Sequence, residues 1–578
     1  MREKIKLYLS KLTFTHMRST LLTFFFCTYI FWGDQSVFAT ATLVNSIANL
    51  QTAVNASAPN DTLLLANGTY TNNTLTIGVS NIVIKAQSNG GVFLNGTNAI
   101  QITGTNNTFS GFQFTSGTIA SNAITVSGDS NMVSQVNFNG YGATHMIYIT
   151  GAYNKIVFCN FQNKPAQLIS KGGTGDMVQI IPNANKVGYN SIRYCSFQHM
   201  PGLGGDFGNE CVRIGDGQYS TMNSGTIVEH CYFEDTGLGD SESISVKSRQ
   251  NVLRFNTMNN NPNAMFSFRN GDNNVAYSNF FINSGGIRCK QANNIYCYNN
   301  YFQGAGTNQS SGLPGSGTAP VYLEYFGTGY GNNFNFLHNT FYGCTANVIQ
   351  KSLTNCTWAN NLFVQPIDSN FSGTTSGQSF AGNMYQGNIG LSISNGMQNI
   401  NPNLSLNNYG CYGLGPMSPA RGASVAAYPA MLNLIGIDTL LKDIQGQPRP
   451  ILRTQRDVGC DQFSADSIAN FPLTLNDVGP DYLKPIATGL QHTLGTISNA
   501  EVSAYPNPMA DRVTFNHLPS GAVLHIVNEK GAVVMQATSD NEGLYELSLG
   551  HLPNGTYCYR VTYLQINIGN GKLIKANP

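Results

Sequence analysis

The segment NKIVFCNF, residues 154–161, decides the fold because variants of it return along the chain. Each variant begins with Asn or Gly, continues with alternating apolar residues, and closes on an Asn-containing step that ends in Phe or Met. The closing residues are Phe114, Phe138, Phe161, Phe197, Phe233, Met258, Phe281, Phe302, Phe341 and Phe363. Most steps between them are 21 to 25 residues long, and the longer steps contain Gly-rich insertions.

Short alternating strands at such a period predict a solenoid, in which each coil adds strands to parallel sheets and is stable only beside its neighbours. Leucine-rich repeats have a similar period, but their regular Leu consensus and helical segments are absent here. We therefore predict an all-β chain that forms a right-handed parallel β-helix. Residues one coil apart would lie about 4.8 Å from each other, so stacked Phe, Ile and Val build the core and stacked Asn side chains hydrogen-bond along the turns.

The composition and the N-terminal segment narrow the class of protein. Charged residues make up 10% of the 578 residues and the formal net charge is +1, which argues against nucleic-acid binding and a polybasic membrane patch. Residues 1–39 resemble a signal peptide, with a basic start, the apolar stretch TLLTFFFCTYIFW, and VFA at the cleavage site. The apolar stretch is short for a membrane span, so we expect cleavage rather than anchoring.

Eleven cysteines follow the signal segment, and none of them forms a CxxC pair that would indicate zinc or a redox site. Cys159, Cys195 and Cys231 occupy the same place in the repeat. This favours stacked, buried thiols that act as small apolar residues. Disulfide pairing is not assigned.

The chain divides into four segments: a signal peptide at residues 1–39, a β-helix with its N-terminal cap at 40–475, a linker at 476–498, and a tail at 499–578. The cap, SIANLQTAVNASAPNDTLLLANGTY, predicts a short amphipathic helix, a turn and a strand that cover the open end of the solenoid. The tail has alternating strands between Gly and Pro turns, which predicts a small antiparallel β-sandwich.

The tail also resembles a known targeting domain. The motifs are YPNP at residues 505–508, LPNGTY at 552–557 and GKLIK at 571–575. They are similar to the C-terminal sorting domain of the type IX secretion system of Bacteroidetes-type bacteria. The resemblance implies handling by that machinery, export through the outer membrane, and a secreted or cell-surface protein. The alternative is a carbohydrate-binding sandwich.

Charged and amide side chains concentrate between residues 206 and 290, although charge is scarce elsewhere. They are Asp206, Asn209, Glu210, Arg213, Asp240, Glu242, Lys247, Arg269 and Arg288. Lys247 and Arg269 are 22 residues apart, about one coil, so we expect them on neighbouring rungs of one sheet. Asp240 and Glu242 share a strand face, but Lys247 is an odd number of residues away, so convergence of all three needs a bend.

Several stretches resemble polysaccharide lyase family six, which contains chondroitinase B and the β-helical alginate lyases. The motifs are DTLLLANGTY at 61–70, NECVRIG at 209–215, ESISVKS at 242–248, FRNG at 268–271, GGIR at 285–288 and DIQGQPR at 443–449. The resemblance covers most of residues 40 to 465. It implies that Lys247 is the Brønsted base and that Arg269 stands beside the leaving glycosidic oxygen. Asn270 replaces the usual His after this Arg and is expected to contact the substrate.

The same resemblance implies a calcium ion. Asp240 and Glu242 match its acidic ligands, and Asn209 or Glu210 is a further ligand candidate. Removing the proton at C5 of a uronate puts negative charge on the neighbouring carboxylate, and an oxygen-bound Ca²⁺ would neutralise that charge. Arg213 and Arg288 would grip carboxylates or sulfates of the flanking sugars.

The predicted function is β-elimination on an acidic polysaccharide by a monomer, with alginate as first choice and chondroitin or dermatan sulfate as second. Three alternatives stay open. The charged residues could form a solvated ion-pair cluster without chemistry. A β-helical hydrolase would need convergent Asp carboxylates, and the repeats contain no such Asp set. A non-catalytic glycan-binding surface protein or adhesin is the third.

Overall fold

A computed structural model describes residues 41–484 and 504–576, with gaps inside both ranges. The gaps are residues 166–174, 201–208, 238–240, 262–263, 307–318, 325–327, 351, 394, 427, 429–439, 519–520, 529–532, 540–542 and 564–565. The chain forms two compact units, Met1–Lys484 and Pro485–Pro578. The predicted signal peptide lies outside the described residues. No helix within the described part of the chain is long and apolar enough to span a membrane.

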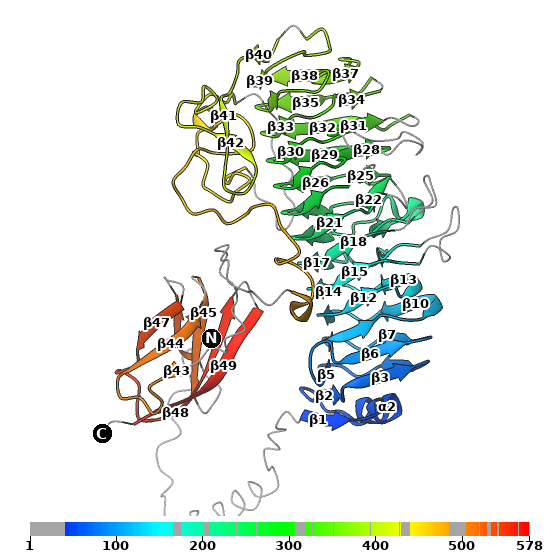
Figure 1. The fold of residues 1–578 in the computed structure, drawn as a ribbon, viewed down its shortest axis with the longest axis vertical. Coiled ribbons are helices and arrows are strands. Elements are labelled where there is room, and N and C mark those ends of the chain that lie inside the picture. Colours follow the sequence, from blue (N-terminus) through cyan, green and yellow to red (C-terminus); the bar gives the residue numbers. More distant parts are fainter. Residues whose placement is uncertain are drawn as a thin grey trace, which may run out of the picture. The chain divides into compact units, whose positions relative to one another are not determined.

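The first unit is a stack of coils whose strands form three long parallel sheets, called A, B and C here (Figure 1). Sheet A contains β1 (Ala41–Val44), β2 (Thr62–Leu65), β5 (Val83–Ala86), β8 (Thr108–Ser110), β11 (Met132–Ser134), β14 (Lys155–Val157), β17 (Ser191–Arg193), β20 (Ile227–Glu229), β23 (Val252–Arg254), β26 (Asn274–Tyr277), β29 (Asn293–Tyr298), β32 (Asn332–Leu337), β35 (Cys356–Ala359) and β38 (Gln378–Ala381). Sheet B contains β3 (Gly68–Thr71), β6 (Val92–Asn95), β9 (Phe112–Phe114), β12 (Asn137–Asn139), β15 (Asn160–Gln162), β18 (Ser196–Gln198), β21 (Tyr232–Glu234), β24 (Thr257–Asn259), β27 (Phe280–Ile282), β30 (Tyr301–Gln303), β33 (Thr340–Tyr342), β36 (Leu362–Val364), β39 (Asn383–Tyr385) and β40 (Met397–Asn399).

Sheet C carries the residues that the sequence analysis singled out. Its strands are β4 (Thr74–Ile77), β7 (Ala99–Ile102), β10 (Thr118–Val126), β13 (Gly142–Ile149), β16 (Val178–Ile180), β19 (Val212–Gly215), β22 (Glu242–Lys247), β25 (Met265–Arg269), β28 (Ile287–Lys290), β31 (Val321–Glu324), β34 (Asn347–Ile349) and β37 (Phe371–Gly373). Each strand pairs in parallel with the strand one coil away. The prediction of an all-β solenoid built from parallel sheets is confirmed.

The closing residues of the repeat form a continuous ladder in sheet B, as predicted. Phe114 pairs with Phe138, Phe138 with Phe161, and the register continues without a break to Phe363. Successive rings stack with centroids 4.6 to 5.5 Å apart, and Met258 takes one rung. These side chains are buried. Aromatic stacking along the axis therefore fixes the register of every coil.

Buried asparagines form a second ladder, also as predicted. Asn256, Asn279, Asn300, Asn339, Asn361 and Asn383 occupy the same turn of six successive coils. In the first five, the side-chain amide donates to the Asn one coil ahead and to a backbone carbonyl of the preceding coil. From Asn279 onward, the Oδ1 accepts the backbone N–H of the preceding Asn. The ladder thus satisfies polar groups that the tight turn would leave unpaired inside the protein.

The N-terminal end is covered by α2 (Ile47–Ala56). Ser46 caps this helix by accepting a hydrogen bond from the Asn49 N–H at 3.1 Å. Its apolar face buries Ile47, Leu50 and Val54 against the first coil. The predicted cap is therefore present. Every cysteine among the described residues is free, and Cys159, Cys195 and Cys231 are buried thiols.

Beyond residue 400 the chain leaves the coils and packs along the solenoid. It forms the hairpin β41 (Leu404–Leu406) and β42 (Tyr412–Leu414) and two short 3-10 helices, Arg453–Gln455 and Asp481–Leu483. Backbone N–H groups of Leu473 and Gly479 donate to Thr257 and Tyr194 of the coils. The first unit consequently reaches Lys484, further than the predicted end near residue 475.

The second unit contains a three-stranded and a four-stranded antiparallel sheet around one buried cluster. Its strands are β43 (Ala504–Tyr505), β44 (Arg512–Leu518), β45 (Val523–Asn528), β46 (Val533–Thr538), β47 (Gly543–Ser548), β48 (Gly555–Tyr563) and β49 (Ile566–Lys575). The predicted antiparallel strands are present, and their arrangement as a β-sandwich stays a prediction.

Removal of one ladder asparagine should destabilise the first unit. Asn300→Ala leaves the Asn279 N–H and the Ala276 carbonyl without their partners inside the protein. We expect the free energy of unfolding to fall by about 1 to 3 kcal/mol in chemical denaturation. Asn139→Ala, which removes a single more exposed Asn–Asn bond, is the control and should cost less. Equal losses in both variants would contradict the role given to the ladder.

Acid sensitivity should be traceable to His230, which lies between the rings of Tyr194 and Phe255 at 4.8 and 5.0 Å. Burial lowers its pKa to about 4, so the folded protein favours the neutral ring. An unfolded histidine takes up a proton near pH 6.5, so this residue's contribution to stability is lost as pH falls from about 6.5 to 4. His230→Phe keeps the stack and should lose less stability between pH 7 and 5 in urea denaturation. An unchanged pH dependence would refute this.

Candidate functional site

Four predicted site residues, Arg213, Lys247, Arg269 and Arg288, lie on two outward rows of sheet C. In the first row, Arg213 pairs with Ser245, Ser245 with Ser267, and Ser267 with Arg288. The second row lies two residues further along each strand. There Val246 pairs with Phe268, so the next residues, Lys247 and Arg269, stand side by side, and Arg269 pairs with Lys290. The alternate residues, such as Val246 and Phe268, point into the core.

The bend that convergence required is present in β22. The register with β25 shifts between Glu242, which pairs with Met265, and Ile244, which pairs with Phe266. This irregularity turns Glu242 toward the same side as Ser245, whose hydroxyl donates to Glu242 Oε2. A bulge in a strand re-aims a side chain in this way. Glu242 therefore shares the outer face with Lys247 and Arg269.

Lys247, Arg269 and Lys290 form a cationic row on three consecutive rungs, and each is backed by a more deeply buried carboxylate. Lys247 Nζ lies 3.2 Å from Glu210 Oε1, Arg269 Nη1 lies 3.6 Å from Glu242 Oε1, and Lys290 Nζ lies 3.4 Å from Glu324 Oε1. The backing carboxylates are those of Glu210, Glu242 and Glu324. The Arg269 side chain is 37% exposed and that of Lys247 13%, whereas Glu210 and Glu242 are nearly inaccessible. The row consequently places positive charge near the solvent, and the paired negative charge lies beneath it.

Glu242 is held by four groups. Ser267 Oγ donates to its Oε1 at 3.0 Å and Ser245 to its Oε2. The guanidinium groups of Arg269 and Arg288 each lie 3.6 Å from Oε1. This carboxylate is thus an anchor for two cations.

Arg213 and Arg288, predicted to grip flanking sugars, lie beneath the surface at 5% and 1% exposure. Arg213 Nη2 lies 2.5 Å from Glu210 Oε2, and Arg288 Nη2 lies 2.7 Å from Glu324 Oε2. Both guanidinium groups hold carboxylates of the protein itself in this structure. Contact with a flanking sugar therefore falls more readily to the exposed cationic row, and the substrate-binding role of these two arginines stays a prediction.

The two amide residues, Asn209 and Asn270, each have a buried side-chain oxygen without a hydrogen-bond partner in the described structure. Asn209 is buried, and neither its Oδ1 nor its Nδ2 has a hydrogen-bond partner within the described structure. Asn270 follows Arg269 with a φ of 63°, in the left-handed region that Asn tolerates, and its buried Oδ1 has no such partner either. Asp240 and Asp206 lie outside the described residues.

A group of buried charges extends from Glu210 toward the N-terminal coils. Asp176 Oδ2 lies 3.2 Å from Arg213 Nε and 3.8 Å from His145 Nε2. Burial raises the pKa of Asp176, and the charge of Glu210 adds to this. Burial also opposes ionisation of Glu210, but the charges of Lys247 and Arg213 outweigh it and hold its pKa below the usual value. Burial lowers the pKa of His145 to about 3.

Asp176 and Glu324 were missed in the sequence. Asp176 precedes Glu210 by 34 residues and Glu324 follows Arg288 by 36, so both sit across coils that carry long insertions. A search at the usual period of 21 to 25 residues passes over them. Counting back from the closing Phe does not find Glu324 either, because it lies 17 residues before Phe341, whereas its register partner Lys290 lies 12 before Phe302.

The described residues alone do not form a calcium site. They contain no group of three or more His, Cys, Asp or Glu side chains placed to hold a metal ion. The oxygens of Glu242 already contact two hydroxyls and two guanidinium groups, and two cations flank Glu210. A metal ion bound at Glu242 would have to replace some of these contacts.

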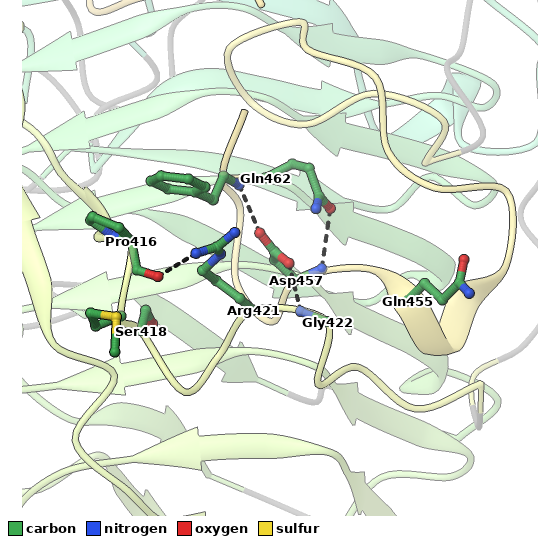
Figure 2. A pocket seen from close by; sticks show the side chains of 9 residues that line it. Pro416, Ser418, Arg421, Gly422, Gln455, Asp457 and Gln462 are labelled. Atoms are coloured by element: carbon green, nitrogen blue, oxygen red, sulfur yellow. Dashed lines mark hydrogen bonds between the residues drawn. The ribbon is translucent and has the colours of Figure 1, made fainter. Parts of the chain in front are cut away.

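A cavity of about 540 Å³ lies away from this face, among the loops of residues 416–463 (Figure 2). The Arg421 guanidinium donates to the Pro416 carbonyl and stacks over the Phe463 ring at 4.1 Å. Asp457 accepts from the backbone N–H groups of Gly422 and Phe463 at 2.7 Å each. The lining polar groups thus tie the loops together, and no predicted site residue takes part.

The outer face of sheet C and the coil architecture define a parallel β-helix protein with an exposed cationic row over buried carboxylates. Residues 44–314 match the family model described as chondroitinase B, and residues 503–575 match the secretion system C-terminal sorting domain. Residues 44–314 are therefore similar to the chondroitinase B family and residues 503–575 to a secretion sorting domain, as the resemblances implied. The sorting domain indicates type IX secretion to the cell surface or extracellular space.

Solved structures share the fold. A PL6 family alginate lyase, AlyGC, has a TM-score of 0.56 and 21% identity over 68% of this chain. The alginate lyase AlyF-OU02, solved with G6, has a TM-score of 0.51 and 17% identity over 66% of this chain and 94% of its own. The present chain covers 59% of the length of AlyGC. No curated protein matches the sequence.

Proposed function

We propose that the first unit is a polysaccharide lyase that cleaves a uronate-containing acidic polysaccharide by β-elimination. The observation that carries this proposal is the placement of Lys247 and Arg269 side by side on the outer face of sheet C. The family match of residues 44–314 supports the same reaction class.

The cationic row supplies the electrostatics that the reaction needs. A uronate carboxylate that approaches Arg269 and Lys290 meets two cations on adjacent rungs, about 4.8 Å apart. Removal of the C5 proton moves negative charge onto that carboxylate, and fixed cations stabilise the charge without reorganisation. The C4–O bond then breaks, the glycosidic oxygen leaves with the electron pair, and a C4–C5 double bond remains.

In this proposal Lys247 abstracts the C5 proton, and Arg269 stabilises the leaving glycosidic oxygen. Glu210 orients the Lys247 amine from below, so that the side chain stays on the outer face. A guanidinium stays charged at any working pH, so Arg269 stabilises the developing oxyanion electrostatically, while the proton that the leaving group finally takes comes from Lys247 or from water.

Alginate is the proposed substrate, with chondroitin or dermatan sulfate second. AlyGC and AlyF-OU02, two solved structures with this fold, are described as alginate lyases, which supports the first choice. The family model is described as chondroitinase B, which supports the second. A non-catalytic glycan-binding surface protein is the alternative. The ion pair of Lys247 with Glu210 favours it, because a paired ammonium is a binding group rather than a base.

Replacement of Lys247 separates these functions. The mature protein mixed with alginate, chondroitin sulfate or dermatan sulfate should generate the ultraviolet absorbance of an unsaturated uronate. In Lys247→Ala we expect kcat to fall by about 10² to 10⁴, the usual worth of a general base. Lys155→Ala, at an exposed lysine of sheet A, is the control. Binding of the polymer without unsaturated product would establish the glycan-binding alternative, and new reducing ends without that absorbance would establish hydrolysis.

Calcium is a separate part of the proposal, and it depends on Asp240. We propose that the Asp240 carboxylate joins Glu242 and Asn209 to bind Ca²⁺, which would then neutralise the substrate carboxylate. The free amide oxygen of Asn209 supports a ligand role. The steps assigned above to Lys247 and Arg269 use side chains of the protein alone.

Calorimetric titration of the EDTA-treated protein with CaCl₂ tests this ion. The wild type should bind Ca²⁺, and Asp240→Asn should weaken binding by about tenfold or more, as expected when a ligand oxygen loses its charge. Asp129→Asn, at a half-exposed ion pair with Lys186, is the control. Absence of heat in the wild type, together with activity that survives EDTA, would remove calcium from the proposal.

A further inference from the structure

A continuous series of buried polar and charged groups reaches Lys247 from three coils away. We call His145, Asp176, Arg213, Glu210 and Lys247 the buried charge chain. The contacts in order are His145 Nε2 to Asp176 at 3.8 Å, Asp176 to Arg213 Nε at 3.2 Å, Arg213 Nη2 to Glu210 at 2.5 Å, and Glu210 to Lys247 Nζ at 3.2 Å. Asp176 is 0% and Glu210 1% exposed.

The fold alone does not require these charges. Buried ion pairs lose most of their Coulomb energy to desolvation, and well-packed apolar side chains usually stabilise as much. The earlier coils of sheet C show this. At positions equivalent to Arg213, those coils carry the uncharged residues Gln179, Tyr148, Thr125 and Gln101. In this row, the first charged side chain is therefore Arg213, one coil before β22 with Lys247.

Asp176 holds Glu210 in two ways. Its Oδ1 accepts the Glu210 backbone N–H at 3.3 Å, which fixes the main chain just before β19. Its Oδ2 pairs with Arg213, whose other end contacts Glu210 Oε2. Only Glu210 Oε1 is then directed at Lys247.

Asp176 is itself anchored by Lys164. The buried Lys164 Nζ donates to the carbonyls of Thr144 at 2.8 Å and Asp176 at 3.3 Å, and it also donates to the Gly175 carbonyl. A lysine used in this way clamps the backbone that presents the Asp176 carboxylate. The backbone that carries Asp176 is thus held at a fixed point in the interior.

We propose that Asp176 is a positioning residue for the reaction, acting through Arg213 and Glu210 to hold the Lys247 amine in place. The inference rests on the proposed function of Lys247. Asp176 lies beneath Arg213 and has no exposed surface, so its effect on substrate is indirect. The cationic partners of the substrate, Arg269 and Lys290, have carboxylates of their own and stay in place without it.

Asp176→Asn keeps the side-chain volume and removes the charge that holds Arg213. We expect kcat to fall by about tenfold to a hundredfold, the effect of misplacing a reacting group by roughly 1 Å, while KM changes by less than about twofold. If Asp176 acts through Glu210, then Asp176→Asn combined with Glu210→Gln should be no slower than Glu210→Gln alone.

Glu229→Gln is the matched control. Glu229 is also a buried carboxylate that bridges two arginines, with Arg193 at 2.7 Å and Arg254 at 2.5 Å, but it belongs to β20 on sheet A. Both single variants should lower the melting temperature, because each removes a buried carboxylate that pairs with arginine. Only Asp176→Asn should lower kcat.

A second measurement is independent of activity. The acetylation rate of Lys247 in the full chain, followed by mass spectrometry, should rise in Asp176→Asn and stay unchanged in Glu229→Gln, with the exposed Lys155 as internal reference. A wild type that yields no unsaturated uronate would refute the proposed function, and the labelling rate would then decide alone whether Asp176 positions Lys247. An unchanged labelling rate, or additive losses of kcat in the double variant, would overturn the inference.

Discussion

Parallel stacking at one fixed register is the constraint on which the rest of the structure depends. Each coil places its residues one strand spacing from their counterparts, so the identity of one side chain decides what its neighbour along the axis must tolerate. Inside, the consequence is the Phe ladder of sheet B and the Asn ladder of the turn, where like residues stack on like. Outside, the same rule brings Lys247, Arg269 and Lys290 together, although 43 residues separate the first from the last.

Like charges stacked on adjacent rungs would repel each other. Carboxylates placed beneath the cationic side chains compensate this repulsion. Glu210, Glu242 and Glu324 each accept two or more cationic contacts from neighbouring rungs. Glu210 and Glu242 are more buried than Lys247 and Arg269, so these two rungs carry their positive charge nearer the surface. Such a face attracts a polyanion and still pairs its own buried charges.

Much of this arrangement could be predicted from the repeat. The closing Phe residues fix the phase of every coil, and counting back from them puts Lys247 and Arg269 on adjacent rungs, which the structure bears out. From the sequence, Glu242 could be expected to face outward only if the strand were bent. In a regularly pleated strand, Glu242 and Lys247 would point to opposite faces, because they are an odd number of residues apart. The register shift between Glu242 and Ile244 supplies that bend, and no residue type in ESISVKS predicts the shift. The roles of Lys247 and Arg269 in a reaction stay predictions.

The sequence by itself determined the solenoid, its ladders and the neighbourhood of the basic residues, because a periodic chain repeats one local geometry and its register follows from counting. Only the tertiary structure decided which charges meet. Asp176 reaches Glu210, and Arg288 reaches Glu324, across coils with long insertions, where the count no longer gives the distance. Whether an arginine faces solvent or lies beneath a glutamate depends on side-chain direction and on competition between neighbouring rungs, and these are properties of the packed stack rather than of any one coil.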